Sequence, residues 1–264
     1  WDYLGETCIG AWAYTPDAKA FDKPYPWKLA DCGAMDILGD PNGELYLAQA
    51  AWGLLKGPVI AVRPVKNTDE KLVKAVWRTT NSIRSWSFCG CEGQRAVVEV
   101  YSPGEKAALF LNGRMLGKKR IKDGMASFKV KYAPGELSAA AYDETGKELG
   151  RDSLFSAVGK LRVRLEPEQT RARVGQTVFV PITLIGANGM RECGADAHID
   201  ATVEGGQLLA LGSANPRTEE SYDVGECTTY YGRAMAVVRG EKAGNLVLTV
   251  RDGWQERTAV IEIY

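Results

Sequence analysis

Histidine is almost absent from this sequence: His198 is the only one among 264 residues. It lies in the stretch AHIDATVE, where apolar and polar residues alternate, and this pattern predicts a strand that exposes His198 to solvent. Zinc sites usually take several histidines or closely spaced cysteines. The scarcity therefore excludes histidine-based catalysis and multi-histidine metal binding, and we expect neither a metal nor a cofactor.

A surplus of charge and long apolar runs are also missing. Lysine plus arginine and aspartate plus glutamate both number 33, so the net charge is zero. Nucleic-acid and anionic-membrane partners call for a basic surplus, and a membrane helix needs about 20 consecutive apolar residues. We therefore expect neither a nucleic acid nor a membrane as partner. No secretion signal is visible, and periplasmic, secreted and cytoplasmic locations all stay open.

The six cysteines are scattered, and none of them forms a CxxC pair. A chain of this length can bury a sizeable core without covalent staples, which favours free thiols over disulfides. The cysteines are Cys8, Cys32, Cys89, Cys91, Cys193 and Cys227.

The first segment, residues 1–57, differs from the rest of the chain. It begins with WDYLGE, continues through a loop rich in proline and aromatic residues, TPDAKAFDKPYPWK, and reaches the turn-forming DPNG. A helix is predicted from near Glu44 until Gly57-Pro58 stops it, with an apolar face made by Leu45, Ala48, Trp52 and Leu55. One strand end and one helix cannot enclose a core. We therefore expect this segment to pack on a body that the sequence does not contain.

The remaining two segments are rich in strand patterns. In residues 58–158, VVEVYS and FKVKY alternate, and Asn112-Gly113 between apolar alternations is a strong hairpin signal. In residues 159–264, stretches such as TVFVPITLIG, LVLTVRD and TAVIEIY follow one another with glycine-rich connections. The predicted fold is mainly β, with two immunoglobulin-like antiparallel β-sandwich domains.

Five motifs in order resemble the C-terminal part of glycoside hydrolase family 2 enzymes of the bacterial β-galactosidase type. WDYLGE is similar to the end of the eighth strand of the family's catalytic (β/α)8 barrel, and CGAMDILGDPNGELYLAQAAW to the following loop and last helix. VVEVYSPGEKAALFLNGRMLGKK and YAPGELSAAAYDETGKELGRD resemble the next sandwich. ALGSANPRTEESY with YYGRAMAVVR resembles the last one.

The resemblance implies three parts: residues 1–57 as the last strand end, loop and helix of the barrel, residues 58–158 as the first sandwich, and residues 159–264 as the second. It also implies a retaining β-glycosidase, with terminal β-galactosides as the expected substrates. Such enzymes need two carboxyl groups, about 5–5.5 Å apart, and the family's pair should lie upstream of Trp1. We therefore expect this chain alone to be inactive. A non-catalytic carbohydrate-binding module and a purely structural role are the alternatives.

Trp1 is the first candidate for substrate contact, because by resemblance the tryptophan of this motif lines the sugar subsite beside the cleaved bond. Glu6, Trp12 and Trp27 lie in the loop that should follow strand eight, where they could contact further sugar units or anchor the loop. Trp52 is expected in a core. Trp86 is expected in a core or a domain seam, with a sugar platform as the third alternative. The expected partners are a glycoside or oligosaccharide and the upstream barrel of the same protein, and a homo-oligomer stays open.

One long loop of the third segment, SANPRTEESYDVGECTTYYGR, is not patterned as a strand. Long loops in compact domains are often functional or form interfaces. Its charged and aromatic residues favour a salt-bridged brace over a carbohydrate-binding face, because charged loop residues mostly make solvated or structural contacts. The residues concerned are Arg217, Glu219, Glu220, Tyr222 and Arg233.

Overall fold

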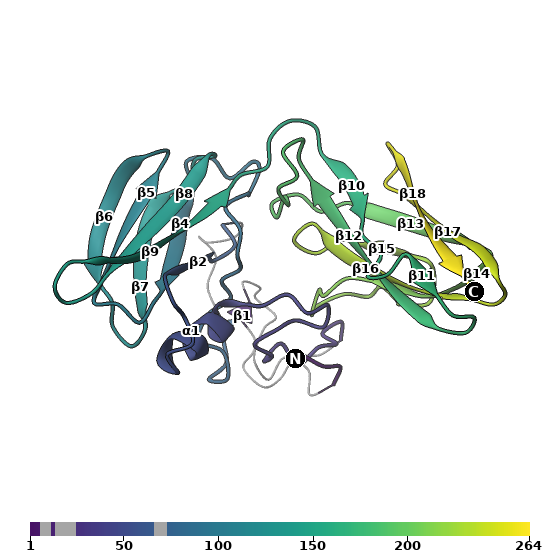
Figure 1. Ribbon diagram of the computed structural model, residues 1–264, viewed down its shortest axis with the longest axis horizontal. Helices are drawn as coiled ribbons and strands as arrows, with labels where there is room; N and C mark the ends of the chain where they lie inside the picture. The colour runs from purple at the N-terminus through teal and green to yellow at the C-terminus, as the bar shows by residue number, and fades with distance from the viewer. Residues whose placement is uncertain (6–11, 14–24, 66–72) are drawn as a thin grey trace. The chain divides into compact units, whose positions relative to one another are not determined.

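The computed structural model describes residues 1–5, 12–13, 25–65 and 73–264, with the backbone alone at 12, 13 and 73. The chain divides into two compact units, Trp1–Ser156 and Ala157–Tyr264 (Figure 1). The described residues form mainly β structure with a single helix, as the sequence predicts. No helix among them combines the length and the apolar character that crossing a membrane takes.

The first unit contains two antiparallel sheets that enclose a core. The three-stranded sheet has the order β2-β4-β7, with β2 (Val59–Val62), β4 (Arg95–Tyr101) and β7 (Met125–Lys131). The four-stranded sheet has the order β6-β5-β8-β9, with β6 (Arg114–Arg120), β5 (Lys106–Leu111), β8 (Glu136–Tyr142) and β9 (Glu148–Phe155). A short pair, β1 (Trp12–Ala13) and β3 (Val73–Lys74), lies outside both sheets.

The turn between β5 and β6 follows from its two residues. Asn112 and Gly113 have φ angles of 50° and 78°, and a two-residue hairpin turn with both φ angles positive favours asparagine and glycine. The Asn112 side chain also accepts a hydrogen bond from the backbone N–H of Glu136 at 2.9 Å. The predicted hairpin is therefore confirmed, and its turn is tied to the neighbouring strand β8.

Trp86 lies in the core of the first unit and is fully buried. Its indole Nε1 donates to the carbonyl of Ala133 at 2.9 Å, and its ring lies 4.8 Å from that of Tyr132 in an edge-on arrangement. A buried tryptophan needs such an acceptor for its N–H. Core packing, one of the three roles considered for Trp86, is thus confirmed.

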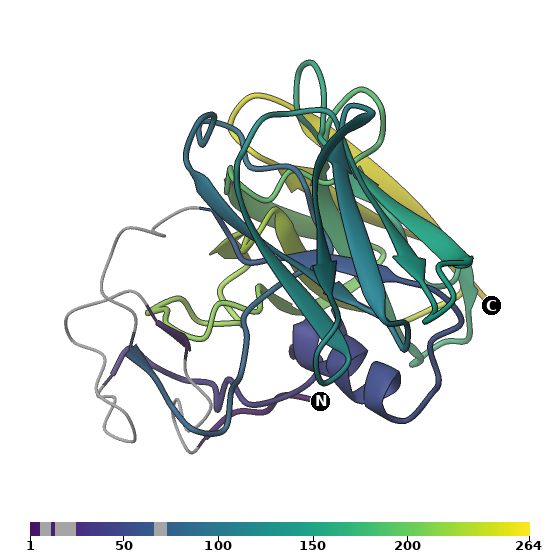
Figure 2. The same cartoon turned by 90° about the vertical axis from the view of Figure 1, so that its left-hand side faces the viewer.

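The helix α1 (Gly43–Ala51) lies at one end of the first sandwich (Figures 1 and 2). Asn42 caps it, because its side-chain oxygen accepts from the backbone N–H of Glu44 at 3.0 Å. Its buried side chains are Tyr46 and Ala50, and the ring of Tyr46 lies 6.1 Å from that of Tyr101 on β4. The helix therefore packs on the sheet through an i, i+4 pair.

The predicted apolar face of this helix is wrong for Ala48 and Trp52, whereas Leu55 packs, partly buried, against the cluster of Tyr46, Ala50 and Tyr101. Trp52, expected in a core, follows the helix as its C-cap and is 82% exposed, and Ala48 is exposed as well. The helical spacing of Leu45, Ala48 and Trp52 marks a real apolar stripe, but Tyr46 and Ala50 mark a second one. The second stripe is buried because Gly43, at the start of the helix, lies so close to Ser82 and Tyr101 that a Cβ would not fit.

The second unit is a sandwich of a four-stranded and a five-stranded sheet. One has the order β10-β12-β16-β14, with β10 (Arg162–Leu165), β12 (Thr177–Ile185), β16 (Arg233–Gly240) and β14 (Gly206–Gly212). The other has the order β11-β18-β17-β13-β15, with β11 (Arg171–Ala172), β18 (Glu256–Ile263), β17 (Gly244–Arg251), β13 (His198–Glu204) and β15 (Glu226–Thr228).

Apolar side chains from both sheets of the second unit fill its core, among them Val178, Ile182, Ile199, Leu211, Leu246 and Ile261. They alternate with exposed positions, as strands with one buried face require. His198 lies on the exposed side of β13, with its Nε2 3.7 Å from a carboxylate oxygen of Glu226. The prediction of a surface histidine is confirmed.

Candidate functional site

The first residues of the chain run beside the segment that precedes the helix. The backbone N–H of Asp2 donates to the carbonyl of Met35 at 2.8 Å, and that of Ala30 donates to the carbonyl of Tyr3 at 3.0 Å. The backbone N–H of Gly5 donates to the carbonyl of Lys28, also at 3.0 Å. These bonds hold Trp1 and its neighbours in an extended conformation, although no regular sheet includes them.

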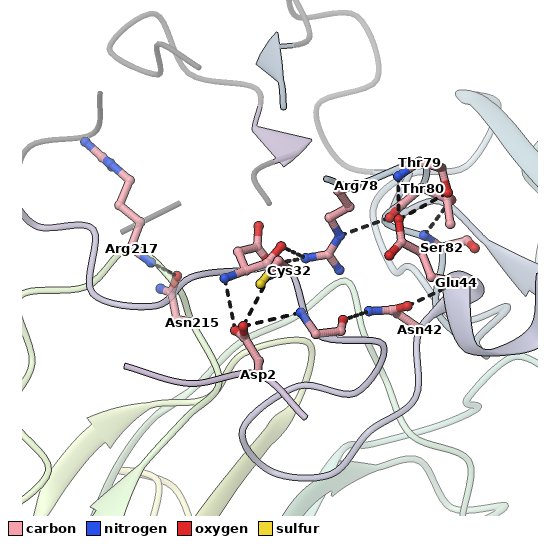
Figure 3. Close-up of polar contacts among 12 residues, drawn as sticks. Asp2, Cys32, Asn42, Glu44, Arg78, Thr79, Thr80, Ser82, Asn215 and Arg217 are labelled. Atoms are coloured by element: carbon pink, nitrogen blue, oxygen red, sulfur yellow. Dashed lines mark hydrogen bonds and ion pairs between the residues drawn. The ribbon is translucent and has the colours of Figure 1, made fainter. Parts of the chain in front are cut away.

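Asp2 is the centre of a polar network that fixes this strand end (Figure 3). Its carboxylate accepts hydrogen bonds from three successive backbone N–H groups: Asp31 and Cys32, both at 3.2 Å, and Gly33 at 3.4 Å. Asp2 is only 8% exposed, so these bonds replace water at the carboxylate. A Cβ at Gly33 would collide with the backbone of Asp2 and Met35, so the approach depends on glycine.

The same network changes the chemistry of Cys32 and reaches the helix. Cys32 is a free cysteine. Burial, and next the negative charge of Asp2, raise the pKa of its thiol, so the thiol stays neutral at pH 7. The carbonyl of Gly33 accepts from the side-chain nitrogen of Asn42 at 2.6 Å. Since Asn42 also caps α1, one asparagine joins the strand end to the helix.

Arg78 ties the network to the sandwich. Its guanidinium forms an ion pair with Asp31, donates to the carbonyl of Asp31 at 2.9 Å, and donates through Nε to the carbonyl of Thr80 at 3.0 Å (Figure 3). The hydroxyl of Thr79 donates to the carboxylate of Glu44, in the first turn of α1, at 3.1 Å. Several polar contacts thus hold the segment beside the first residues of the chain against the helix and the sandwich.

A buried carboxylate lies beneath this network. Glu99 on β4 is 0% exposed, and Arg63 binds it through Nε at 2.8 Å and through a terminal nitrogen at 2.7 Å. The hydroxyls of Thr80 and Tyr101 donate to its other oxygen at 2.7 and 2.6 Å. Burial, and next the Glu99 charge, raise the pKa of the Tyr101 phenol, which therefore stays protonated and acts as a donor. These contacts replace the hydrogen bonds to water that the Glu99 carboxylate loses on burial. A carboxylate buried without such partners would be strongly destabilising.

The four predicted substrate-contact residues differ in how they are placed. Trp1 is 71% exposed; its Nε1 donates to the carbonyl of Ile37 at 3.3 Å, and its ring lies against Gly39. Trp27 is only 6% exposed. Glu6 lies outside the described residues, and Trp12 lies in β1 with its side chain undescribed. Their contact with sugar stays a prediction.

The long loop of the second unit uses its polar residues within the unit. The carboxylate of Glu220 accepts from the backbone N–H of Thr228 at 2.9 Å and from its hydroxyl at 2.6 Å. The side chain of Asn215 accepts from the backbone N–H of Arg217 at 3.0 Å. These bonds order the loop internally, while the predicted brace to another body stays a prediction.

Metal ligands do not gather in this structure: within the described ranges, no group of three or more histidine, cysteine, aspartate or glutamate residues could hold a metal ion. The network around Asp2 consists of carboxylates already occupied by backbone N–H groups and by a guanidinium. Its arrangement can position Trp1.

Two parts of the chain match known protein families. Residues 161–259 match the family described as glycoside hydrolase family 2 C-terminal domain 5. Residues 93–150 match a domain of unknown function, DUF4982. No curated protein matches the chain.

Solved structures match the chain over most of its length. A glycosyl hydrolase family 2 member from Bacteroides cellulosilyticus is 30% identical, with a TM-score of 0.83; the match covers 100% of this chain and 35% of that one. A family 2 member from Bacteroides cellulosilyticus DSM 14838 is 28% identical over 88% of this chain and 32% of that one, with a TM-score of 0.76.

A β-glycosidase from Bacteroides vulgatus, 23% identical over 90% of this chain and 29% of that one, shares the fold with a TM-score of 0.69. The chain thus spans about a third of the length of the family 2 members that it resembles. The order of the five motifs in the sequence predicts the same relationship, namely similarity to the C-terminal part of family 2 enzymes. The chain corresponds to the C-terminal part of a glycoside hydrolase family 2 protein.

Proposed function

We propose that this chain is the C-terminal portion of a retaining β-glycosidase that hydrolyses terminal β-glycosides, with β-galactosides as the expected substrates. The observation that carries the proposal is the match of the whole chain, at 30% identity, to about a third of a family 2 glycosyl hydrolase. In this proposal the two catalytic carboxylates lie upstream of Trp1. The chain supplies one wall of the active site and two accessory sandwiches.

We further propose that residues 1–57 are the last strand end, loop and helix of a (β/α)8 barrel, followed by sandwiches at 58–158 and 159–264. Exposed apolar side chains in the first part support this division. Trp1 and Trp52 are 71% and 82% exposed, and Leu54 is 67% exposed. Exposed tryptophans also occur beyond this segment, at Trp77 and Trp254, so the family motifs carry the division and the exposure agrees with it. The upstream barrel is the body that the family motifs suggest.

Trp1 is the proposed sugar-contact residue of this chain. Its indole is exposed, and the apolar face of a pyranose packs well on an aromatic ring. Active sites of (β/α)8 enzymes lie at the carboxyl ends of the barrel strands, where the motif would place it. Asp2 would keep the strand end fixed, because its carboxylate is bound to the backbone N–H groups of residues 31–33.

The test compares this chain with the complete protein that includes the upstream residues. Nitrophenyl β-galactoside, β-glucuronide, β-glucoside and β-mannoside are the substrates. We expect turnover of one of them by the complete protein and none by the 264-residue chain. Trp1→Ala in the complete protein should lower kcat/KM by roughly tenfold to a hundredfold, or ~1.4–2.7 kcal/mol.

Trp254→Ala is the matched control, because Trp254 is an exposed tryptophan in the second unit. It should leave kcat/KM unchanged. Turnover by the chain alone would contradict the proposed location of the carboxylates. A complete protein without activity on any β-glycoside, together with binding of galactosides by the chain, would favour the non-catalytic binding module instead.

A further inference from the structure

The two sheets of the second unit present different surfaces to the outside. In the five-stranded sheet, the outward positions of β13, β17 and β18 are polar except for Val247 and Val260. Arg251 on this face binds the carboxylates of Asp200 and Glu256, with 3.5 and 2.8 Å between the paired atoms. This is the polar outer face that an antiparallel sheet in water normally shows.

The four-stranded sheet has an apolar outer face instead. On its strands β12, β16 and β14 (Figure 1), Val180, Ala236 and Leu211 are fully buried in the core, so the residues that alternate with them point outward. The outward residues at the centre of the sheet are apolar and at least partly exposed, and we call them the apolar patch: Phe179, Pro181, Met235, Val237 and Ala210. Phe179 alone is 44% exposed.

The register of the strands makes the apolar patch continuous. Phe179 pairs with Val237, and Val237 pairs with Ala210, so these three residues form one row across three strands. Pro181 pairs with Met235 in the next row. Side chains directly opposite each other on one face of an antiparallel pair have Cβ atoms about 4.5–5.5 Å apart. The five side chains therefore form one surface and are not scattered exposed residues.

Polar groups surround the apolar patch. At one end, the guanidinium of Arg239 donates to the side chain of Gln207 at 2.9 Å. Along the side next to β10, the backbone N–H of Glu166 donates to the carbonyl of Pro181 at 3.1 Å, and the Glu166 carboxylate pairs with Arg164, also at 3.1 Å. An apolar centre inside a polar rim is the usual composition of a protein interface. The opposite sheet, with its ion pairs, has the composition of a surface in water.

We propose that the apolar patch is the docking surface for the upstream portion of the same protein, the portion that precedes Trp1. The chain corresponds to the C-terminal part of a family 2 protein, and its match covers 35% of the member from Bacteroides cellulosilyticus. The larger part of such a protein therefore lies outside this chain and is available to cover the patch. The proposal rests on the proposed function and deepens it, because there the upstream portion is the catalytic barrel.

The size of the apolar patch argues against a second copy of the chain as its occupant. With about 4.8 Å between strands and about 3.4 Å per residue along them, two rows across three strands cover roughly 200 Å². A stable interface between free molecules takes about 800 Å² from each partner. A domain of the same polypeptide needs less contact area, because the covalent link holds it at a high local concentration. The patch therefore suits a neighbour in the same polypeptide.

Hydroxyl-radical footprinting, read by mass spectrometry, tests the proposal on the 264-residue chain and on the complete protein. Phe179 and Met235 report on the apolar patch, while Val260 and Trp254, which are 52% and 91% exposed, report on other surfaces of the same unit. We expect the labelling of Phe179 and Met235 to fall at least about fivefold in the complete protein, because the centre of an interface excludes water. The labelling of Val260 and Trp254 should stay the same.

Two variants locate the docking surface. Phe179→Asp places a carboxylate in the apolar patch, and Val260→Asp is the matched control, because it places one at an exposed apolar position of the opposite sheet. In the complete protein, Phe179→Asp should raise the labelling of Met235 to its level in the chain alone, because a buried unpaired charge opposes docking. Val260→Asp should leave that labelling low. In the 264-residue chain both variants should keep the original labelling of Met235, which shows that the unit stays folded.

Three results would overturn the proposal. Strong labelling of the apolar patch in both proteins would mean that nothing upstream covers it. Weak labelling already in the chain alone would mean that the chain covers its own patch, and protection that grows with the concentration of the chain would mean that a second copy does. Footprinting requires no turnover, so a complete protein that protects the patch but hydrolyses no β-glycoside would refute the proposed function alone. An active glycosidase with an uncovered patch would refute this proposal alone.

Discussion

Replacing the buried carboxylate of Glu99 by its amide should destabilise the first unit more than any change to a surface ion pair. Glu99 is 0% exposed, and Arg63 and two hydroxyls all donate to it. An amide keeps one oxygen but turns the other position into a donor. In Glu99→Gln, therefore, the charge opposite Arg63 is lost, and either Arg63 faces a group that cannot accept or the hydroxyls of Thr80 and Tyr101 must turn from donors into acceptors.

The size of the effect follows from the burial of the two partners. Removing one partner of a buried ion pair costs about 3–5 kcal/mol. The Arg63 side chain is 24% exposed and can recover some hydration, so we expect the low end, about 3 kcal/mol. For a unit of this size that lowers the melting temperature by roughly 6–12 °C. Tyr101→Phe removes one donor and should cost about 1 kcal/mol.

Chemical denaturation followed by tryptophan fluorescence measures the change, because Trp86 is fully buried in the same unit. Glu105→Gln is the control: Glu105 pairs with Arg120 at 2.9 Å, but both side chains are exposed, at 37% and 69%. It should change the free energy of unfolding by no more than about 0.5 kcal/mol. If Glu99→Gln cost no more than this control, the carboxylate would not support the fold as argued.

Further changes test other features. Gly33→Ala should detach the first residues, because a Cβ there collides with the backbone of Asp2, and faster amide exchange at residues 30–35 would report it; protection equal to that of the original chain would contradict the argument. Burial, and next Glu220, raise the pKa of Cys227 from 9.0 to about 12, so its contribution to stability is complete below pH 9 and falls as the pH rises toward 12. Unfolding measured between pH 8 and 11 should show a smaller loss of stability in Cys227→Ala than in the original chain, and equal losses would refute this. Trp52→Ala should change the stability of this chain by less than about 0.5 kcal/mol, because the side chain is exposed. A larger loss in a denaturant titration would mean that Trp52 packs after all.

The sandwiches could be predicted from the sequence because their signals are local. Alternation in stretches such as VVEVY and TVFVP sets which side chains face a core, and Asn112-Gly113 specifies its turn without help from distant residues. His198 could be placed on the surface for the same reason. Each of these features depends on residues within a few positions of one another.

The polar network could not be predicted, because its partners are far apart in sequence. Asp2 binds the backbone of residues 31–33, and Arg78 binds Asp31. Only Glu99 left a visible signal: a carboxylate inside the apolar run VVEVY must either point to solvent or find partners in the core. The sequence does not specify which residues those partners are.

The helix shows how a correct pattern led to a wrong assignment. Its sequence GELYLAQAA is apolar on nearly every side, and a helix of that kind is normally buried all round. In this chain only the side with Tyr46 and Ala50 is covered, and the exposed Trp52 and Leu54 continue the open side. The spacing predicted one buried stripe, made by Leu45, Ala48, Trp52 and Leu55, whereas the sandwich covers the side with Tyr46 and Ala50. A helix that lies between a sandwich and a barrel would leave such a stripe uncovered when the barrel is absent. If the proposed function is correct, Trp52, which is 82% exposed in this chain, should therefore be buried in the complete protein.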